Sequence, residues 1–468
     1  MKKLLLLIIS ITLLNAGCMK KKEIITLNFY YMIGGDYFKE EKAKAINDYL
    51  KESNSGYQIN FVSMINTIPY DPKNENVVYA SMSTRILDYL KNARDNQEVI
   101  DIVNVNQIGT MDFSRTYLVD ENLLTNLDSY FENTEAGKIV YDAYPEIVFE
   151  SQKIYGSSYS IPGYLFDLIE FKKSCLEGVS YMAIKEDALK QYQFNEPLGY
   201  DLSQYNDFLR AIGDHNENQL LFYNSFRIMN NYPHLTPVCG SSLRVSPFVI
   251  DENTQTVKII YECEDWLNSL VTFQSLYQDD YYVYDIDHKD TDEIIHYDYY
   301  DHDQEKKYVE IEPNYNYVNV IPYWGLAIPS WCDKKEKVMD FFGLLYSDPE
   351  LSRLFFPEGL KPEEKMYFGY GNPYIVENST LPQDLTKENH QKFYEASNKS
   401  CAFGLTFDFS HYFEEMQDLV VKHNEYFTSY NAPELIDMEL YKEVMKETRI
   451  EEIRDDLNNQ LQIYLSGK

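Results

Sequence analysis

The stretch VIDIVNV at residues 99–105 decides the fold, because a continuous apolar run of this length is typical of a central strand in a parallel sheet. A second apolar run, residues 24–31, predicts a buried strand that ends before Gly34-Gly35. Between the two runs, the pattern favours a helix over 38–50, a strand over 57–64 and a helix over 86–93. This alternation of strands and helices predicts an α/β lobe with a doubly wound sheet.

Polar residues follow two of these predicted strands. In open α/β sheets, ligands bind beyond the carboxyl ends of the strands. The first candidates for ligand contact are therefore Tyr30, Tyr31, Asn104, Asn106 and Gln107.

Residues 99–162 also carry a family resemblance. They run VIDIVNVNQIG, YLVDENLLTNLDSYF and YPEIVFESQKIYGSSYSIPG, and this order resembles the first lobe of the extracellular solute-binding proteins of ABC importers, carbohydrate type (family 1). The sequence departs from the family at 151–158, where the usual Gly-Lys is replaced and an extra Gly-Ser-Ser is present. The resemblance implies a two-lobed periplasmic-binding-protein-like (type II) fold, each lobe a doubly wound sheet flanked by helices, with a hinge crossing at Ile161-Pro162.

The second lobe is then expected over 163–319. Strands are predicted near 165–171, 220–226 and 257–261, and helices over 181–192, 201–212 and 265–277. Tyr164, Asp167 and Trp266 are candidates for the cleft between the lobes. For Trp266, however, packing in the core is the stronger interpretation, since a lone aromatic residue at helical spacing usually packs.

Residues 279–312 stand apart, with 13 acidic residues, 3 lysines and 7 tyrosines. Three histidines, His288, His296 and His302, suggest a metal site, but a calcium loop would need a third oxygen ligand and a glycine that are missing after Asp287. The histidines also lack paired spacing on a helix. A solvated, mobile acidic insertion is the favoured interpretation, and a bound cation is the alternative.

The family resemblance returns at Asn319 with NVIPYWGLAIPSWCDKKEKVMDFFGLLYSDPELSRLFFPEG. It implies that 320–375 return to the first lobe and that Tyr323 and Trp324 lie near the hinge. An indole there could stack on a sugar face, with core packing as the alternative.

The motifs FGYGNP at 368–373, which contains Asn372, and FGLTFD at 403–408 resemble a subset of these lipoproteins with a C-terminal domain of unknown function. Expected helices over 412–427 and 450–464 match its layout, and Tyr464 replaces its usual final Trp. The implied arrangement is a helical segment, 376–468, packed mainly on the second lobe.

The N-terminus has the pattern of an export signal. Two lysines, an apolar run over 4–14 and the stretch LNAGC at 14–18 resemble a bacterial lipoprotein signal, in which residues 1–17 are removed and Cys18 is lipidated. A plain secretory signal is the alternative. The expected location is the outer face of the cell membrane, held there by lipid alone, since the apolar run is too short to span a bilayer.

The amino-acid composition limits which classes of partner are possible. The formal charge of −33 excludes nucleic acid, which needs a basic surface. Besides Cys18 there are five cysteines without metal-site spacing, so buried thiols are expected, with one disulfide left open; they are Cys175, Cys239, Cys263, Cys332 and Cys401. We expect a monomer without a cofactor or metal.

The sequence contains no G-x-S-x-G, H-E-x-x-H or Walker motif, so catalysis is the weaker hypothesis. A carboxylate pair for glycoside hydrolysis could be assembled from so many acidic residues, and such a pair is therefore uninformative. The family resemblance implies a binding protein that closes on a carbohydrate, preferably an oligosaccharide, and delivers it to the permease of an ABC importer. A peptide-binding lipoprotein is the alternative, and a carbohydrate-active enzyme ranks below it.

Overall fold

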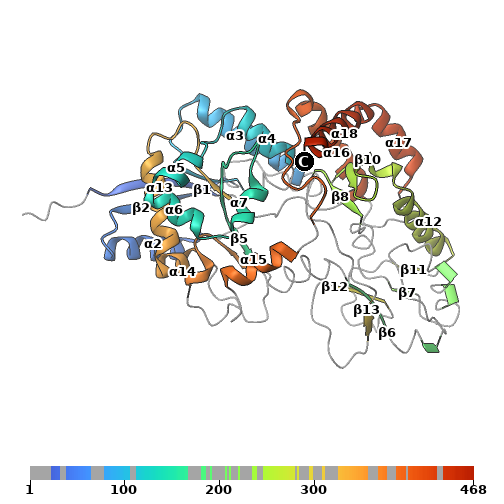
Figure 1. Ribbon diagram of the computed structural model, residues 1–468, viewed down its shortest axis with the longest axis horizontal. Coiled ribbons are helices and arrows are strands. Elements are labelled where there is room, and N and C mark those ends of the chain that lie inside the picture. Colours follow the sequence, from blue (N-terminus) through green and yellow to red (C-terminus); the bar gives the residue numbers. More distant parts are fainter. Residues whose placement is uncertain are drawn as a thin grey trace, which may run out of the picture.

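The computed structural model describes 23–31, 38–64, 78–105, 112–166, 181–185, 190–191, 206–207, 210–211, 220–221, 234–239, 246–279, 282–283, 295–298, 308–310, 325–356, 367–376, 386–396, 399–429 and 436–467. Figure 1 shows two halves, with β1, β2 and α13 in one and β6, β7 and α12 in the other. The chain is a two-lobed α/β protein, as the sequence predicts.

The first lobe is built on a five-stranded sheet with the order β2-β1-β3-β14-β4. The strands are β1 (Ile25–Tyr31), β2 (Tyr57–Ser63), β3 (Ile102–Asn104), β4 (Ile161–Pro162) and β14 (Gly325–Ala327). β1 is parallel to β2 and β3, whereas β14 lies between β3 and β4 and is antiparallel to both. The late strand β14 is therefore an interior strand of the first lobe.

Helices cover both faces of this sheet because side chains alternate along each strand. Phe29, Ile102 and Leu326 belong to one apolar cluster, together with side chains of α2 (Glu40–Glu52), α13 (Lys335–Ser347) and α14 (Pro349–Phe355). The next residues, Tyr30, Val103 and Ala327, belong to a second cluster with α3 (Val78–Asp95) and α4 (Asp112–Asp120). This two-sided burial explains why Ile102 and Val103, on opposite faces of β3, are both apolar.

Three short helices complete the first lobe beside the sheet: α5 (Asp128–Asn133), α6 (Glu135–Asp142) and α7 (Glu146–Gln152). Helix α6 packs closely against α13, where a Cβ on Gly343 would lie 2.7 Å from the Ala136 Cβ. The lobe therefore joins residues before 163 to residues after 324.

The described strands of the second lobe form three small sheets. β8 (Leu235–Pro237), β9 (Phe248–Asp251) and β10 (Thr256–Ile259) are antiparallel, and β7 (Leu220–Leu221) pairs with β11 (Tyr282–Val283). β6 (Tyr181–Lys185) lies between β12 (Ile295–Asp298) and β13 (Tyr308–Glu310). The helix predicted over 181–192 is therefore wrong for 181–185, because strand pairing on both sides overrides local propensity.

The acidic segment 279–312 is also more ordered than expected. Its strands β11, β12 and β13 pair with β7 and β6, so three stretches of it are parts of sheets. The expectation of a wholly mobile insertion is wrong for these stretches. These strands are only two to four residues long, and the many acidic residues around them concealed the short apolar stretches.

The C-terminal segment shares a core with the second lobe. Helix α12 (Glu264–Gln278) and the sheet β10-β9-β8 pack with α16 (Phe413–Ser429), α17 (Met438–Lys446) and α18 (Ile450–Gly467) in one apolar cluster. Helix α18 lies along β10. In contrast, α15 (Lys387–Ala396) lies against α7 of the first lobe, and the Nζ of Lys387 donates to the carbonyl oxygen of Asp142 at 2.6 Å.

Two antiparallel strands lie side by side where the chain leaves the first lobe and where it returns to it. β5 (Tyr164–Phe166) follows β4 after one residue and pairs antiparallel with β15 (Tyr367–Gly369). The pair β5–β15 therefore joins the start of the 163–319 segment to the last part of the 320–375 segment.

Candidate functional site

The candidate site is the edge of the first-lobe sheet at which its parallel strands end. β1, β2 and β3 end at Tyr31, Ser63 and Asn104. The antiparallel strand β14 begins at the same edge, where Leu326 pairs with Asn104 and Gly325 pairs with Pro162. The segments that leave this edge contain most of the residues predicted to contact a ligand.

Several of those residues lie outside the described part of the chain. They are Asn106, Gln107, Asp167, Tyr323, Trp324 and the lipidation candidate Cys18. Tyr164 lies in β5, of which the backbone is described. For these positions, ligand contact stays a prediction.

The two tyrosines at the end of β1 pack inside the first lobe. The Tyr30 hydroxyl donates to a carboxylate oxygen of Glu98 at 2.8 Å, and burial together with that carboxylate raises the pKa of Tyr30 to about 12. The Tyr31 ring is 6% exposed and lies edge-on to Phe29 and Phe38. In this structure both rings are parts of apolar clusters.

Asn104 and Asn372, two predicted ligand contacts, are brought close to each other. The side chain of Asn104 is buried and donates to the Tyr370 hydroxyl, two residues before Asn372. Asn372 caps the 3-10 helix η6 (Pro373–Ile375), since its Oδ1 accepts from the Tyr374 amide at 3.0 Å. Both asparagines therefore already have protein partners.

Two tyrosines that the sequence patterns did not indicate hold the backbone beside β4 and β15 by hydrogen bonds. The hydroxyl of Tyr346 donates to the Pro162 carbonyl at 3.0 Å, and the hydroxyl of Tyr144 donates to the Gly371 carbonyl at 3.1 Å. Asn372 Nδ2 donates to the Tyr346 carbonyl at 3.3 Å. We call Tyr144, Tyr346, Gly371 and Asn372 the hinge anchor, because they hold the chain where it enters β5 and where it leaves β15.

Gly371 is required in the hinge anchor for two reasons. Its φ of +116° is disfavoured for residues with a side chain, and a Cβ would lie 2.9 Å from the Ser352 Oγ. The FGYGNP motif could have indicated this close approach, because a glycine between Tyr370 and Asn372 is what such a turn needs.

Trp266 lies in the core, as the sequence favours. Its side chain is 2% exposed and belongs to the cluster shared by the second lobe and the C-terminal segment, where it packs on Phe427. The structure does not bring Trp266 to the edge of the first-lobe sheet.

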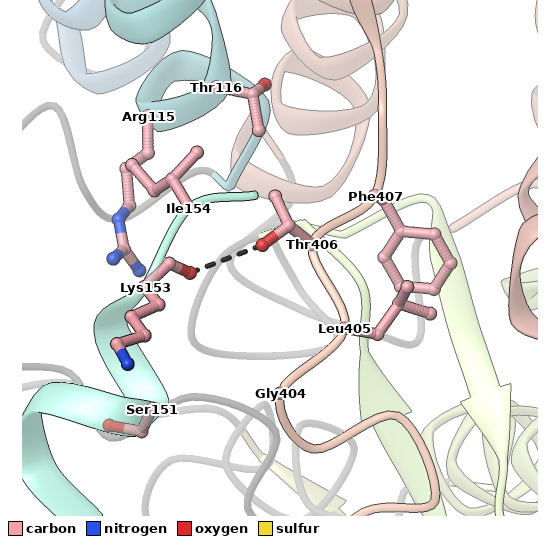
Figure 2. Close-up of a pocket in the computed structure, with 9 residues that line it drawn as sticks. All are labelled: Arg115, Thr116, Ser151, Lys153, Ile154, Gly404, Leu405, Thr406 and Phe407. Carbon is pink, nitrogen blue, oxygen red and sulfur yellow. Dashed lines mark hydrogen bonds between the residues drawn. The ribbon is translucent and has the colours of Figure 1, made fainter. Parts of the chain in front are cut away.

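A small pocket lies where the first lobe meets the C-terminal segment (Figure 2). Arg115, Lys153 and Ile154 line it from the first lobe, and 404–407 line it from the other side. It has room for about one water molecule, so it does not accommodate a sugar ring. The pocket marks a contact between the two halves of the molecule.

Comparison with known proteins gives structural matches alone: no protein-family model and no curated protein matches the sequence. A crystal structure of the N-glycan transport solute-binding protein NgtS from Streptococcus pneumoniae, in complex with Man5GlcNAc, is 16% identical; the match covers 95% of this chain and 99% of that chain, with a TM-score of 0.56. The S. pneumoniae ABC-transporter substrate-binding protein FusA, in complex with kestose, is 12% identical, with 95% and 100% covered and a TM-score of 0.51. An extracellular solute-binding protein from Bifidobacterium longum subsp. infantis is 11% identical, with 95% and 99% covered and a TM-score of 0.51.

The chain has the fold of ABC-transporter solute-binding proteins. The family resemblance that the sequence indicates is therefore confirmed at the level of the fold. The solute-binding fold extends over both lobes and the C-terminal segment, since these matches cover 95% of the chain.

Three further observations concern the described residues. Among them, no helix is both long and apolar enough to cross a bilayer. No three of their His, Cys, Asp and Glu side chains are grouped as metal ligands. The described cysteines Cys263 and Cys332 are buried free thiols, and burial raises the pKa of Cys263 to about 12.

Proposed function

We propose that this protein captures a carbohydrate between its two lobes and delivers it to an ABC importer. The likeness to the solute-binding fold carries this proposal, because these matches cover 95% of this chain. In such a protein, ligand shifts the equilibrium between open and closed forms by its greater affinity for the closed form.

An oligosaccharide is the ligand class that we favour. NgtS was crystallised with Man5GlcNAc and FusA with kestose, and each of these is larger than a single sugar. Aromatic side chains stack on the apolar faces of sugar rings, while amides and carboxylates bind the hydroxyl groups. The high content of tyrosine, 43 residues, suits that chemistry.

We place the binding residues in the segments that leave the sheet edge. Asn106 and Gln107 follow β3, Tyr323 and Trp324 precede β14, and Tyr164 and Asp167 start the crossing to the second lobe. In this scheme 18–162 and 320–375 form the first lobe, 163–319 form the second, and 376–468 pack mainly on the second.

We further propose that lipid on Cys18 holds the mature protein at the outer face of the cell membrane. The pattern of 1–18 supports this anchor. Anchored in this way, the protein would dock as a monomer on the permease of the importer, with both lobes in contact.

A thermal-shift screen tests the ligand class. The soluble chain from residue 19 is heated with Man5GlcNAc, kestose, a maltose oligosaccharide or a tetrapeptide. A ligand at 100 times its Kd stabilises the protein by about 2.7 kcal/mol, so a binder raises Tm clearly. A shift with peptide alone would support the peptide-binding alternative, and turnover of a sugar that shifts Tm would support an enzyme.

A pair of tryptophans tests the location of the site. We expect Trp324→Ala to weaken sugar binding with little change in Tm. Trp331→Ala is the matched control, because the Trp331 indole packs on the α3 side of the sheet and donates to the Glu98 carbonyl at 2.9 Å. Trp331→Ala should lower Tm and leave the Kd for sugar unchanged. If Trp324→Ala also lowers Tm and leaves the Kd unchanged, Trp324 is a core residue and not a ligand contact.

A further inference from the structure

The first lobe touches the C-terminal segment along a contact that we call the seam. On the first-lobe side it consists of α4 and the turn 153–157, and on the other side of residues 404–413 (Figure 2). Helix α16, which begins at Phe413, lies against both α3 and α4. The seam is therefore a second connection between the two halves, separate from the strands β5 and β15.

Hydrogen bonds form one part of the seam. Ile154 and Ser157 pair across a tight turn in which Tyr155 and Gly156 have φ values of +51° and +79°. The hydroxyl of Thr406 accepts from the Tyr155 amide at 3.3 Å and donates to the Lys153 carbonyl at 3.2 Å. A single threonine side chain thus holds the turn by its backbone on both sides.

Two stacked rings form the other part. Tyr117 of α4 and Phe413 of α16 are nearly parallel, with centroids 3.6 Å apart and an angle of 12°. Lys91 fixes Tyr117 from the first-lobe side, since its Nζ lies 3.1 Å from the Tyr117 hydroxyl. Phe413 packs against the α3–α4 cluster of the first lobe and also against the core of the second lobe.

The C-terminal side of the seam is firmly attached to the second lobe. Phe407 and Phe409 are buried in the cluster that contains β9, β10 and α12. The Tyr464 hydroxyl donates to the Phe403 carbonyl at 2.6 Å, and the Asp408 amide donates to Gln460 Oε1 at 2.8 Å. We therefore expect residues 405–409 to move together with α18 and the second lobe.

We propose that the seam is the pivot of lobe closure, with Phe413 and Thr406 as the positioning residues. Parallel rings can turn about their common axis without losing contact, and one threonine hydroxyl tolerates a small rotation of the turn that it holds. The seam keeps the lobes at a fixed distance on one side while the strands β5 and β15 bend on the other. This inference rests on the proposed closure of the lobes.

Distance measurements without ligand test the pivot. Spin labels on non-natural amino acids at Lys44 of α2 and Leu440 of α17, both exposed, report the separation of the lobes by pulsed electron resonance. We expect Phe413→Ala to raise the population of long distances about fivefold, the factor that corresponds to the ~1 kcal/mol of an aromatic pair. Thr406→Val, which removes two hydrogen bonds and keeps the shape, should shift the distribution in the same direction.

Tyr117→Phe is the matched control, since it keeps the ring stack and loses the hydrogen bond to Lys91. Its distance distribution should equal that of the wild type. The proposal fails if Phe413→Ala and Thr406→Val both lower Tm but leave the distance distribution unchanged. The seam would then stabilise the fold by packing and would not act as a pivot. Because no sugar is present in the experiment, a failure to bind sugar would refute the proposed function and leave this test intact.

Discussion

The hinge anchor gives a quantitative prediction for Tyr346→Phe. The Tyr346 side chain is fully buried and its hydroxyl donates to the Pro162 carbonyl at 3.0 Å, at the residue before the crossing to β5. The variant removes the donor and leaves the Pro162 carbonyl without it. We expect a loss of about 1–2 kcal/mol in the free energy of unfolding, or roughly 3–6 °C in Tm for a lobe of this size.

Tyr261→Phe is the same chemical change with the opposite expected sign. Within the described part of the chain, the buried hydroxyl of Tyr261 has no hydrogen-bond partner. A buried hydroxyl without a partner costs free energy, so its removal should raise stability by up to about 1 kcal/mol. Both substitutions delete one oxygen from a tyrosine, and their difference therefore isolates the hydrogen bond.

Urea unfolding followed by fluorescence measures both variants, and the slope of unfolding free energy with urea should stay constant. The reasoning is refuted if Tyr346→Phe is as stable as the wild type, or if both variants lose the same free energy. In the second case, the loss would come from packing around the ring and not from the bond to Pro162.

Three further predictions concern other parts of the fold. Burial and the nearby Asp408 raise the pKa of Asp120 above its ordinary 3.8, so the charged form of this carboxyl group lowers the stability of the fold at neutral pH. Asp120→Asn should therefore be more stable than the wild type at pH 7, and the difference should disappear as the pH falls through the raised pKa. Tm measured as a function of pH checks this. Asp348→Ala should cost about 1–2 kcal/mol in urea unfolding, because its carboxylate accepts from two amides at the start of α14, both at 3.0 Å, and from the Tyr49 hydroxyl. Leu457→Ala should cost about 2–5 kcal/mol, since Leu457 is fully buried between α18 and the second lobe, and calorimetry should show a lower Tm.

The first lobe could be predicted from the sequence because local patterns and burial agree there. The apolar run of β1, whose last three residues are all buried, and the amphipathic pattern of α2 each point to one structure. The second lobe was harder, because β6 is defined by partners far along the chain. Residues 181–185 were predicted as helical, and only their pairing with β12 and β13 makes them a strand.

The candidate site was predictable by position and not by contact. The sequence gives Asn104 and Asn372 as candidates for one site, and the structure joins Asn104 to Tyr370, two residues before Asn372. The sequence could not show that the hydroxyls of Tyr346 and Tyr144 bond to the backbone here, because both residues lie in stretches with the pattern of an ordinary apolar core. Spacing within a helix shows that such a residue is buried, whereas the partner of its hydroxyl depends on the tertiary fold.

The interior position of β14 has a consequence for biosynthesis. Ala327 pairs with Val103, which lies in the first quarter of the chain, so the first-lobe sheet lacks an inner strand until the ribosome has passed the second lobe. Pairing of this kind is slow because a long loop must close first. A fragment that stops at Pro162 would leave β3 and β4 unjoined, with bare edges open to aggregation. The two lobes are thus separate in shape but interdependent in assembly, and the first-lobe sheet is completed only after the second lobe has been synthesised.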